Sequence, residues 1–192
     1  MPGGGKSTVG RHLARALGVP VIDSDAKIEE RIGEPIRSFF DREGEARFRD
    51  IESEVLSEVL DGLGEALLAT GGGIVLRDVN RELLNAHTTV LYLRSTPEEL
   101  FRRLRHDTQR PLLQVRDPLA KLRELHAQRD PLYRRTAHYV LEAGRSVHGL
   151  VNMALMQLEL AGVIDPERVA ATVGAEPHVH SAHEFRDSSH RS

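Results

Sequence analysis

The sequence predicts an α/β protein in which helices cover both faces of a parallel β-sheet. Along most of the 192 residues, short apolar runs alternate with segments whose apolar residues recur at helical spacing. Acidic residues or glycines directly follow the apolar runs, as at Asp23, Asp25 and residues 71–73. Ligands of such sheets bind beyond the carboxyl ends of the strands. The same observations therefore predict where a binding site lies.

The first half of the chain supplies helices and two strands. Val9, Leu13 and Leu17 share one helical face over residues 6–17, and Gly18 is a typical residue for the end of that helix. Further along this half, we expect a buried strand over 19–22, short helices over 26–32 and 36–40, a longer helix over 47–60 and a strand over 66–69.

The second half continues the alternation, and its clearest strand is the apolar run at 89–93. Proline in the first turn supports a helix that begins at Pro97. We also expect helices over 79–86, 97–104, 118–135 and 147–161 and a strand over 138–142. Residues 1–162 then form one domain, and the polar segment 163–192 is predicted to be a disordered tail.

Composition narrows the class of protein. A net charge of −3 argues against general affinity for nucleic acid or for an anionic membrane. The absence of cysteine excludes disulfides and thiolate chemistry and fits a reducing cytoplasm. The most apolar stretch, residues 150–164, is too short and too polar to span a bilayer. We expect a cytoplasmic monomer.

Gly5-Lys6-Ser7 matches the end of the phosphate-binding pattern G-x-x-x-x-G-K-S/T. Glycines let backbone N–H groups surround a phosphate, and the helix that follows points its positive end at it. Lys6 would bridge the β- and γ-phosphates of ATP, and the Ser7 hydroxyl would bind Mg²⁺. The alternative is a glycine-rich segment that merely precedes a helix.

The first glycine of this pattern would fall one position before Met1, and the strand that leads into the loop is absent from the sequence. One explanation is that coding sequence upstream of Met1 supplies a short Val/Ile/Leu-rich strand followed by glycine. The other is that the protein lacks an element that its relatives need. We favour the first explanation, and a stop codon immediately upstream would contradict it.

The other polar clusters each allow two interpretations. Near Mg-ATP, Asp23 and Asp25 could hold a metal-bound water and orient an alcohol, or Asp25 could cap the next helix. Arg49 could bind a carboxylate through its guanidinium fork, although a lone helical arginine is usually solvated. The glycines at 71–73 form either a turn or a close approach to a ligand. The histidines of the tail, such as His178, are typical of a polar tail.

Several segments together resemble the shikimate kinase family. The matching segments, in family order, are Gly5-Lys6-Ser7-Thr8-Val9-Gly10-Arg11, Asp23-Ser24-Asp25, Gly44-Glu45-Ala46-Arg47-Phe48-Arg49, Gly71-Gly72-Gly73, Arg110-Pro111-Leu112-Leu113 and Arg129-Asp130-Pro131-Leu132-Tyr133. The resemblance implies a three-layer α/β/α P-loop kinase of the nucleoside-monophosphate-kinase type, with a lid at about 105–117. It also implies transfer of the ATP γ-phosphoryl group to the 3-hydroxyl of shikimate.

The motif and the resemblance together imply a set of site residues. The catalytic residues are Lys6, Asp25 and Arg110, the last of these in the lid. The ATP-binding residues are Gly3, Gly4, Gly5, Lys6, Ser7, Thr8, Arg103 and Arg110. The shikimate-binding residues are Asp25, Arg49, Gly71, Gly72, Gly73 and Arg129, and the Mg²⁺ ligands are Ser7 and Asp23.

Two rival functions stay open at this point. The first is another small-molecule kinase of this fold, acting on gluconate or a nucleotide, against which the arginine pair and the triple glycine argue. The second is an inactive ATP-binding remnant, which the missing strand suggests. In the family that strand lies in the middle of the sheet, so its loss would leave ladder hydrogen bonds unmade.

Overall fold

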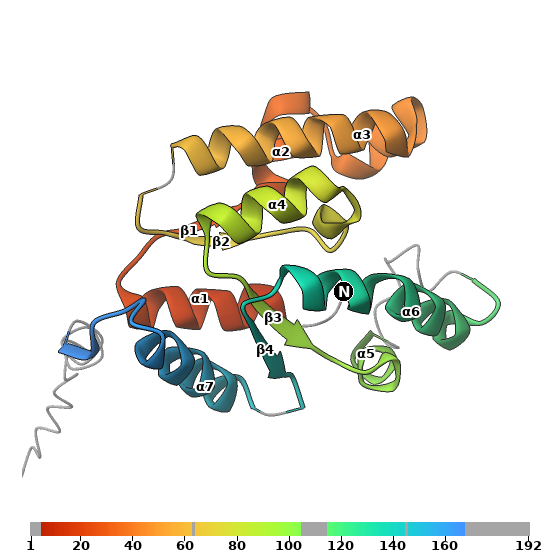
Figure 1. Cartoon of the computed structure of the whole chain (residues 1–192). Helices are drawn as coiled ribbons and strands as arrows, with labels where there is room; N and C mark the ends of the chain where they lie inside the picture. The colour runs from red at the N-terminus through yellow and green to blue at the C-terminus, as the bar shows by residue number, and fades with distance from the viewer. Residues whose placement is uncertain (1–4, 63, 105–114, 145, 168–192) are drawn as a thin grey trace, which may run out of the picture.

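The computed structural model describes residues 5–62, 64–104, 115–144 and 146–167 (Figure 1). In chain order its elements are α1 (Lys6–Leu17), β1 (Val21–Asp23), α2 (Ser24–Ile32), α3 (Ile36–Asp61), β2 (Leu67–Ala69), the 3₁₀ turn η1 (Ile74–Leu76), α4 (Asp78–His87), β3 (Leu91–Arg94), α5 (Pro97–Leu104), α6 (Pro118–Thr136), β4 (Tyr139–Glu142) and α7 (Val147–Leu160). Within these ranges, no helix combines the length and the apolar character that crossing a bilayer requires.

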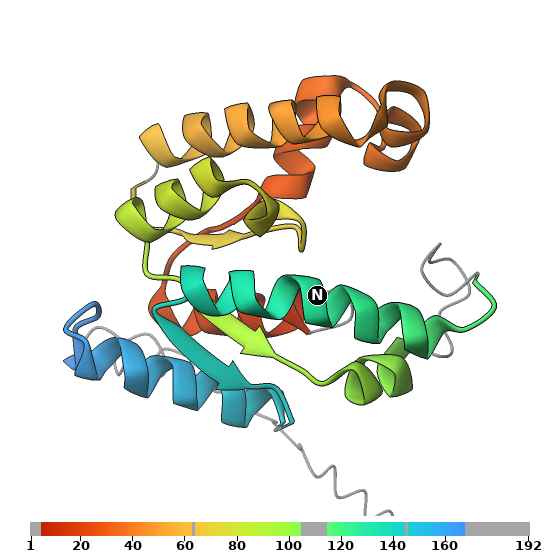
Figure 2. The same cartoon turned by 45° about the vertical axis from the view of Figure 1, so that its right-hand side comes forward.

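The strands form two separate parallel pairs, where the sequence predicts one sheet. In one pair β1 lies beside β2 with Val21 opposite Leu67, and in the other β3 lies beside β4 with Leu91 opposite Tyr139. Figures 1 and 2 show the two pairs apart from each other. The prediction that the first strand is buried is wrong: among the described residues β1 pairs with β2 alone, and Val21 is 42% exposed.

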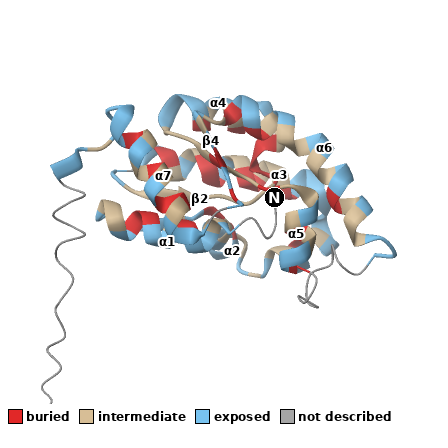
Figure 3. Ribbon diagram, turned by 90° about the horizontal axis from the view of Figure 1, so that it is seen from below, coloured by how far each residue is buried: buried red, intermediate tan, exposed pale blue. Residues whose placement is uncertain are grey.

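Three apolar clusters form the core, and Figure 3 shows buried residues in the interior. One cluster joins α3 and α4 to β3, α5 and α6 around the fully buried Leu100 and Leu122. A second packs α1 against β4 and α7. The third joins α2 to α3 through Ile28, Phe39 and Phe48. The first two clusters therefore include strand residues, whereas the third joins helices alone.

Several predicted boundaries move in the structure. The helices expected over 36–40 and 47–60 are joined in α3, which breaks at Gly44, where φ is 80° and ψ is 172°. Glycine adopts this positive φ with little strain, so the chain bends there without ending the helix. The turn η1 after the triple glycine was not predicted. The other helices and strands lie within one or two residues of their expected positions.

Parts of the predicted lid and tail lie outside the described residues. These are residues 105–114 of the lid and 168–192 of the tail. The described chain does continue beyond 162, the expected end of the domain. Val163 N–H donates to the Leu158 carbonyl at 2.9 Å, and Glu167 N–H donates to Asp165 Oδ1 at 2.9 Å. The first bond ties the start of the predicted tail to the end of α7, and the second is a local turn within the tail segment.

Candidate active site

A polar cavity of about 270 Å³ lies beyond the carboxyl ends of β1 and β2. Its walls come from α1, the β1–α2 junction, the glycine segment after β2, and α6. They are Lys6, Ser7, Asp23, Asp25, Ala69, Thr70, Gly71, Gly72 and Arg129. The cavity thus brings together seven residues that the sequence assigned to catalysis, metal or substrate, from four separate parts of the chain.

The first turn of α1 forms one wall of the polar cavity. Gly5 precedes the helix with φ at 77°, a left-handed conformation that favours glycine. Lys6 and Ser7 follow in the first turn and line the cavity. The first N–H groups of a helix have no partner within it, and they carry the positive end of its dipole. This wall therefore suits a phosphate group.

Asp23 and Asp25 line the same cavity but occupy different structural positions. Asp23 ends β1 and caps α2, because its Oδ1 accepts the Asp25 N–H at 2.9 Å. The alternative in which Asp25 caps the helix is therefore wrong. Asp25 lies inside the first turn of α2, which begins at Ser24. Its carboxyl group lies so close to Gly71 that a Cβ there would be 2.5 Å from Asp25 Oδ1.

The pKa of Asp25 is raised above its ordinary value of 3.8. Burial is the largest cause, and the neighbouring carboxylates of Asp23 and Glu29 add to it. The positive charges of Lys6 and Arg49 act in the opposite direction. Burial and like charge together make this carboxylate a stronger base than an exposed one.

Arg49 lies on α3 beside the polar cavity and is held by two carboxylates. Its Nη1 donates to Glu52 Oε2 at 2.7 Å, and its Nη2 donates to Glu45 Oε1 at 3.1 Å. The guanidinium also lies 5.1 Å from the centre of the Phe48 ring. A side chain on Gly73 would collide with this guanidinium. Gly73 is not among the residues that line the polar cavity. Its lack of a side chain leaves room for the Arg49 guanidinium.

Glu52 is the first site residue that sequence reasoning missed. It is only 2% exposed, and burial raises its pKa against the opposing effect of Arg49. A buried carboxylate needs a partner, and Arg49 is that partner on the same helix. The available signal was the spacing, because residues three apart lie on one helix face.

Tyr133 is the second missed residue, and it ties α6 to the glycine segment. Its hydroxyl donates to the Gly72 carbonyl at 2.5 Å, and burial raises its pKa, so the hydroxyl keeps its proton. Its ring stacks on Tyr92 with centroids 4.8 Å apart. The Tyr92 hydroxyl in turn donates to Asp130 Oδ1 at 2.9 Å, next to Arg129. These contacts fix the part of α6 that carries Arg129.

Some predicted site residues lie elsewhere or outside the described chain. Arg103 donates to the Ala143 carbonyl at 2.7 Å and does not line the polar cavity. Thr8 is exposed on α1. Gly3, Gly4 and Arg110 lie outside the described residues.

The polar cavity offers few ligands for a cation. Across the described ranges, no group of three or more His, Asp or Glu side chains could hold a metal ion. Ser7 and Asp23 nevertheless line the cavity together. Mg²⁺ commonly takes one or two protein oxygens and completes its shell with water and substrate phosphates. The predicted pair of oxygen ligands is therefore compatible with Mg²⁺ that arrives with a nucleotide.

Comparison with known proteins gives one consistent answer. The family model for shikimate kinase matches residues 2–159. The chain is 59% identical over 169 residues to a shikimate kinase of Paracidovorax citrulli. This alignment covers 86% of the chain and 92% of the relative. The chain is also 52% identical over 165 residues to a shikimate kinase of Ralstonia nicotianae, in an alignment that covers 85% of the chain and 86% of that relative.

A solved structure gives the same answer for the fold. The shikimate kinase from Acinetobacter baumannii in complex with shikimate superposes with a TM-score of 0.76 at 43% identity. The match covers 85% of this chain and 90% of the other. The predicted α/β P-loop kinase fold is confirmed. The chain belongs to the shikimate kinase family.

Proposed function

We propose that this chain transfers the γ-phosphoryl group of ATP to the 3-hydroxyl of shikimate. The products are shikimate 3-phosphate and ADP, a step of chorismate and aromatic amino-acid biosynthesis. The observation that carries the proposal is the polar cavity, where Lys6, Asp25 and Arg129 surround one space beside the first turn of α1. The chain's family and the shikimate in the Acinetobacter baumannii complex support the same acceptor.

The nucleotide side of the cavity is the first turn of α1. There Lys6 and the helix N–H groups would hold the β- and γ-phosphates. Ser7 would bind Mg²⁺ directly, and Asp23 would hold one of its waters. When bound, Mg²⁺ neutralises part of the charge on the transferring phosphoryl group. Asp23 keeps its capping contact with the Asp25 N–H, so its orientation does not depend on the nucleotide.

The acceptor side centres on Asp25. Its raised pKa suits a general base, so its carboxylate would accept the proton of the shikimate 3-hydroxyl. The hydroxyl oxygen forms the new bond to the γ-phosphorus, and the bond from that phosphorus to the bridging oxygen breaks as ADP leaves. Gly71 leaves the space that this chemistry needs, because any side chain there would overlap the Asp25 carboxyl group.

The shikimate carboxylate would be bound by Arg129 from α6 and by Arg49 from α3. A guanidinium can donate two parallel hydrogen bonds to a carboxylate. Glu52 and the Phe48 ring hold Arg49 in place from behind. The N–H groups of the glycine segment, above all that of Gly72, would contact the ring hydroxyls of shikimate.

The remaining roles rest on the family resemblance. Gly3, Gly4, Gly5 and Thr8 would complete the phosphate loop, Arg103 would lie along the adenine, and Arg110 would reach the γ-phosphate from a lid at about 105–117. The catalytic domain would be 1–162, followed by the tail 163–192. We further propose a cytoplasmic monomer without nucleic-acid partners.

An acceptor panel tests the proposal. The full chain with Mg-ATP is offered shikimate, gluconate or a nucleoside monophosphate, and the products are identified by mass. We expect phosphorylation of shikimate alone. Phosphorylated gluconate or nucleotide would assign another kinase activity. If no acceptor reacts, a cooperative melt that Mg-ATP leaves unshifted would favour the inactive remnant over a slow kinase.

A further inference from the structure

The glycine segment, residues 71–73, continues directly into the turn η1, and backbone hydrogen bonds join the two. The Gly71 carbonyl accepts the Ile74 N–H at 3.3 Å, and the Gly73 carbonyl accepts the Leu76 N–H at 3.0 Å. The last carbonyls of a helical turn have no partner within it, and η1 is only three residues long. Its own carbonyls therefore need partners from elsewhere in the molecule.

Two consecutive side chains in the first turn of α4 supply these partners, and we call them the α4 clamp. Asn80 Nδ2 donates to the Ile74 carbonyl at 3.0 Å. Arg81 Nη1 donates to the Val75 carbonyl at 2.7 Å and to the Leu76 carbonyl at 3.3 Å. All three carbonyls of η1 are thus bound by the α4 clamp, which fixes the turn to the helix that follows it.

The α4 clamp is itself held in place. Asn80 is 0% exposed, and the Arg81 side chain is 17% exposed and forms an ion pair with Asp78. Just before α4, Arg77 Nη2 donates to Asp50 Oδ1 of α3 at 2.6 Å. The glycine segment is therefore fixed relative to α3, the helix that carries one of the two predicted carboxylate-binding arginines.

The Asn80 amide favours a positioning role over a purely stabilising one. Its Oδ1 is buried and has no hydrogen-bond partner among the residues that the structure describes. A buried polar atom without a partner costs free energy, and an apolar side chain of similar shape would avoid that cost. What the amide does provide is one hydrogen bond, to the Ile74 carbonyl.

With its carbonyls already bound, the glycine segment can still donate hydrogen bonds to a ligand. Gly71 N–H donates to Ser24 Oγ at 3.3 Å, whereas no hydrogen bond in the described part of the chain takes up the N–H of Gly72. Gly72 lines the polar cavity. Glycine loses more backbone freedom on ordering than any other residue. A segment that is ordered in advance therefore binds a substrate oxygen with a smaller entropic loss.

We propose that Asn80 and Arg81 are positioning residues for shikimate, which act by holding η1 and thereby the N–H of Gly72. The identity of the ligand rests on the proposed kinase function. Neither Asn80 nor Arg81 is among the residues that line the polar cavity, so the effect reaches the substrate through the backbone of residues 71–76. Loss of the α4 clamp should weaken shikimate binding and leave nucleotide binding at α1 unchanged.

The test compares Asn80→Leu with Asn85→Leu in the full 192-residue chain. Asn85 lies on the same helix, and its Nδ2 donates to the Thr136 carbonyl of α6 at 3.3 Å, so the control loses a similar bond away from the glycine segment. We expect Asn80→Leu to raise the KM for shikimate about tenfold, with a smaller change in kcat and an unchanged KM for ATP. Its Tm should change little, because the unpaired Oδ1 disappears together with the bond. Asn85→Leu should keep the KM for shikimate.

Variants of the second member of the α4 clamp add a conservative rescue. Arg81→Met keeps much of the aliphatic side chain but donates no hydrogen bond, and it should also raise the KM for shikimate about tenfold. Arg81→Lys retains a charged donor and should recover part of this loss. Because Arg81 is partly exposed, these two variants decide the question if Asn80→Leu does not fold.

Amide hydrogen exchange measures the effect of the α4 clamp without turnover. The N–H groups of Ile74 and Leu76 join η1 to the glycine segment. In the ligand-free chain they should exchange about tenfold faster in Asn80→Leu and Arg81→Met than in the unmodified protein. In Asn85→Leu they should exchange at the unmodified rate.

Three results would overturn the proposal. One is an unchanged KM for shikimate in both Asn80→Leu and Arg81→Met. Another is an equal rise of this KM in Asn85→Leu. The third is a lower Tm with unchanged exchange of the Ile74 and Leu76 amides, because the two side chains would then only stabilise the fold. Failure of the proposed function would appear in the unmodified chain, as no phosphorylation of shikimate, whereas failure of the α4 clamp appears only in the comparison of variants.

Discussion

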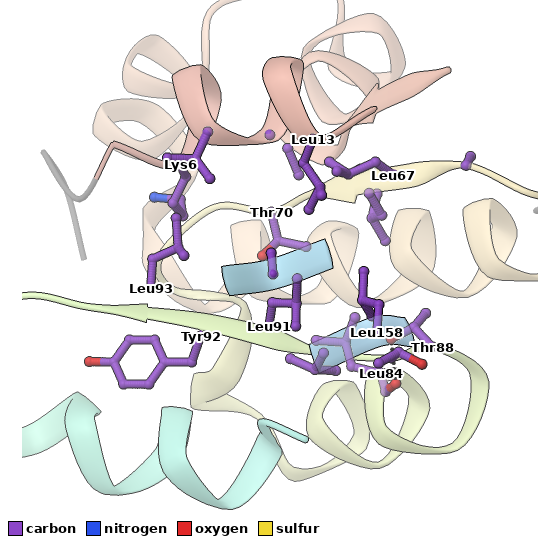
Figure 4. Close-up of a pocket in the computed structure, with 18 of the residues that line it drawn as sticks. Lys6, Leu13, Leu67, Thr70, Leu84, Thr88, Leu91, Tyr92, Leu93 and Leu158 are labelled. Atoms are coloured by element: carbon purple, nitrogen blue, oxygen red, sulfur yellow. Dashed lines mark hydrogen bonds between the residues drawn. The ribbon is translucent and has the colours of Figure 1, made fainter. Parts of the chain in front are cut away.

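The polar cavity lies next to a second cavity of about 470 Å³ between β2 and β3, the inter-sheet cavity, and the two share Lys6 (Figure 4). They differ in how their walls are held. In and around the polar cavity, most functional side chains have partners. Asp23 caps α2, Glu52 holds Arg49, and Tyr133 binds the Gly72 carbonyl. In the inter-sheet cavity, apolar side chains such as Leu91 are half-buried, and within the described ranges β2 and β3 each pair with a strand on one side only.

This difference suggests that substrate binding and the stability of the fold depend on different parts of the molecule. The contacts that form the polar cavity come from short segments and from α3 and α6. The side chains that line the inter-sheet cavity lie instead between the two strand pairs. We therefore expect changes in the polar cavity to alter activity, and the inter-sheet cavity to limit the free energy of unfolding.

The largest effect is expected at the base. Asp25→Asn should lower kcat by about 10²–10⁴-fold, because the variant cannot accept the hydroxyl proton. Its affinity for Mg-ATP should remain, as measured by titration calorimetry. Asp61→Asn, at the exposed end of α3, is the matched control and should keep full activity. Normal turnover in Asp25→Asn would remove Asp25 from the mechanism.

The same residue predicts a pH dependence. Because the folded-state pKa of Asp25 is raised, its ionisation destabilises the fold at neutral pH, and this penalty disappears as pH falls below the unfolded value near 3.8. Asp25→Asn should therefore melt at a higher temperature than the parent at pH 7, with the gap closing on acidification. The acid limb of kcat/KM should lie above pH 3.8. A limb at or below that pH would contradict the assignment.

The next largest effect compares the core with the inter-sheet cavity. Leu100 is fully buried in the cluster around β3, so Leu100→Ala should cost about 2–5 kcal/mol in the free energy of unfolding. Leu91→Ala, in the cavity wall, should cost about 1 kcal/mol, because its side chain already has an empty neighbour. Urea denaturation measures both values. Equal losses would mean that the inter-sheet cavity is as well packed as the core.

Loss of a carboxylate-binding group should have a moderate effect. Arg49→Ala should raise the KM for shikimate by about 10–100-fold through loss of charged hydrogen bonds, with a smaller change in kcat. Arg47→Ala removes an exposed arginine from the same helix and should leave both constants unchanged. Steady-state kinetics at saturating Mg-ATP distinguishes them. An unchanged KM in Arg49→Ala would exclude its role in binding the carboxylate.

The smallest effect is expected at Tyr133. Tyr133→Phe keeps the stack on Tyr92 but removes the hydrogen bond to the Gly72 carbonyl, which should cost about 1 kcal/mol. Because Gly72 lines the polar cavity, the KM for shikimate should rise a few-fold. Tyr139→Phe, on β4 and outside both cavities, is the control. Equal behaviour of the two variants would show that the Tyr133 hydroxyl does not position the glycine segment.

Local patterns predicted much of the fold. The helix over 6–17 is confirmed because its apolar spacing, its preceding Gly5 and its terminal Gly18 all act within one segment. The four strands were found near their expected positions for the same reason. A sheet divided by the missing middle strand was weighed only under the remnant alternative. Which strands pair could not be predicted from local patterns, because pairing joins residues far apart in the sequence, such as Val21 and Leu67.

For the site too, residues in local motifs were predicted, whereas residues that act through tertiary contacts were missed. The motifs identified residues that now share the polar cavity, including Lys6 and Asp25. The partners that hold it together were missed where they depend on tertiary contact, as with Tyr133 and the Gly72 carbonyl. The alternative of a capping role was considered for Asp25 and not for Asp23, because the residue type could not show that α2 begins at Ser24.

The most direct test of the polar cavity as a shikimate site is a calorimetric titration of shikimate into the unmodified 192-residue chain without nucleotide. The account predicts saturable binding of one shikimate per chain, strongly weakened in Arg49→Ala and retained in Arg47→Ala. Absence of binding to the folded chain, or equal binding by the two arginine variants, would contradict it.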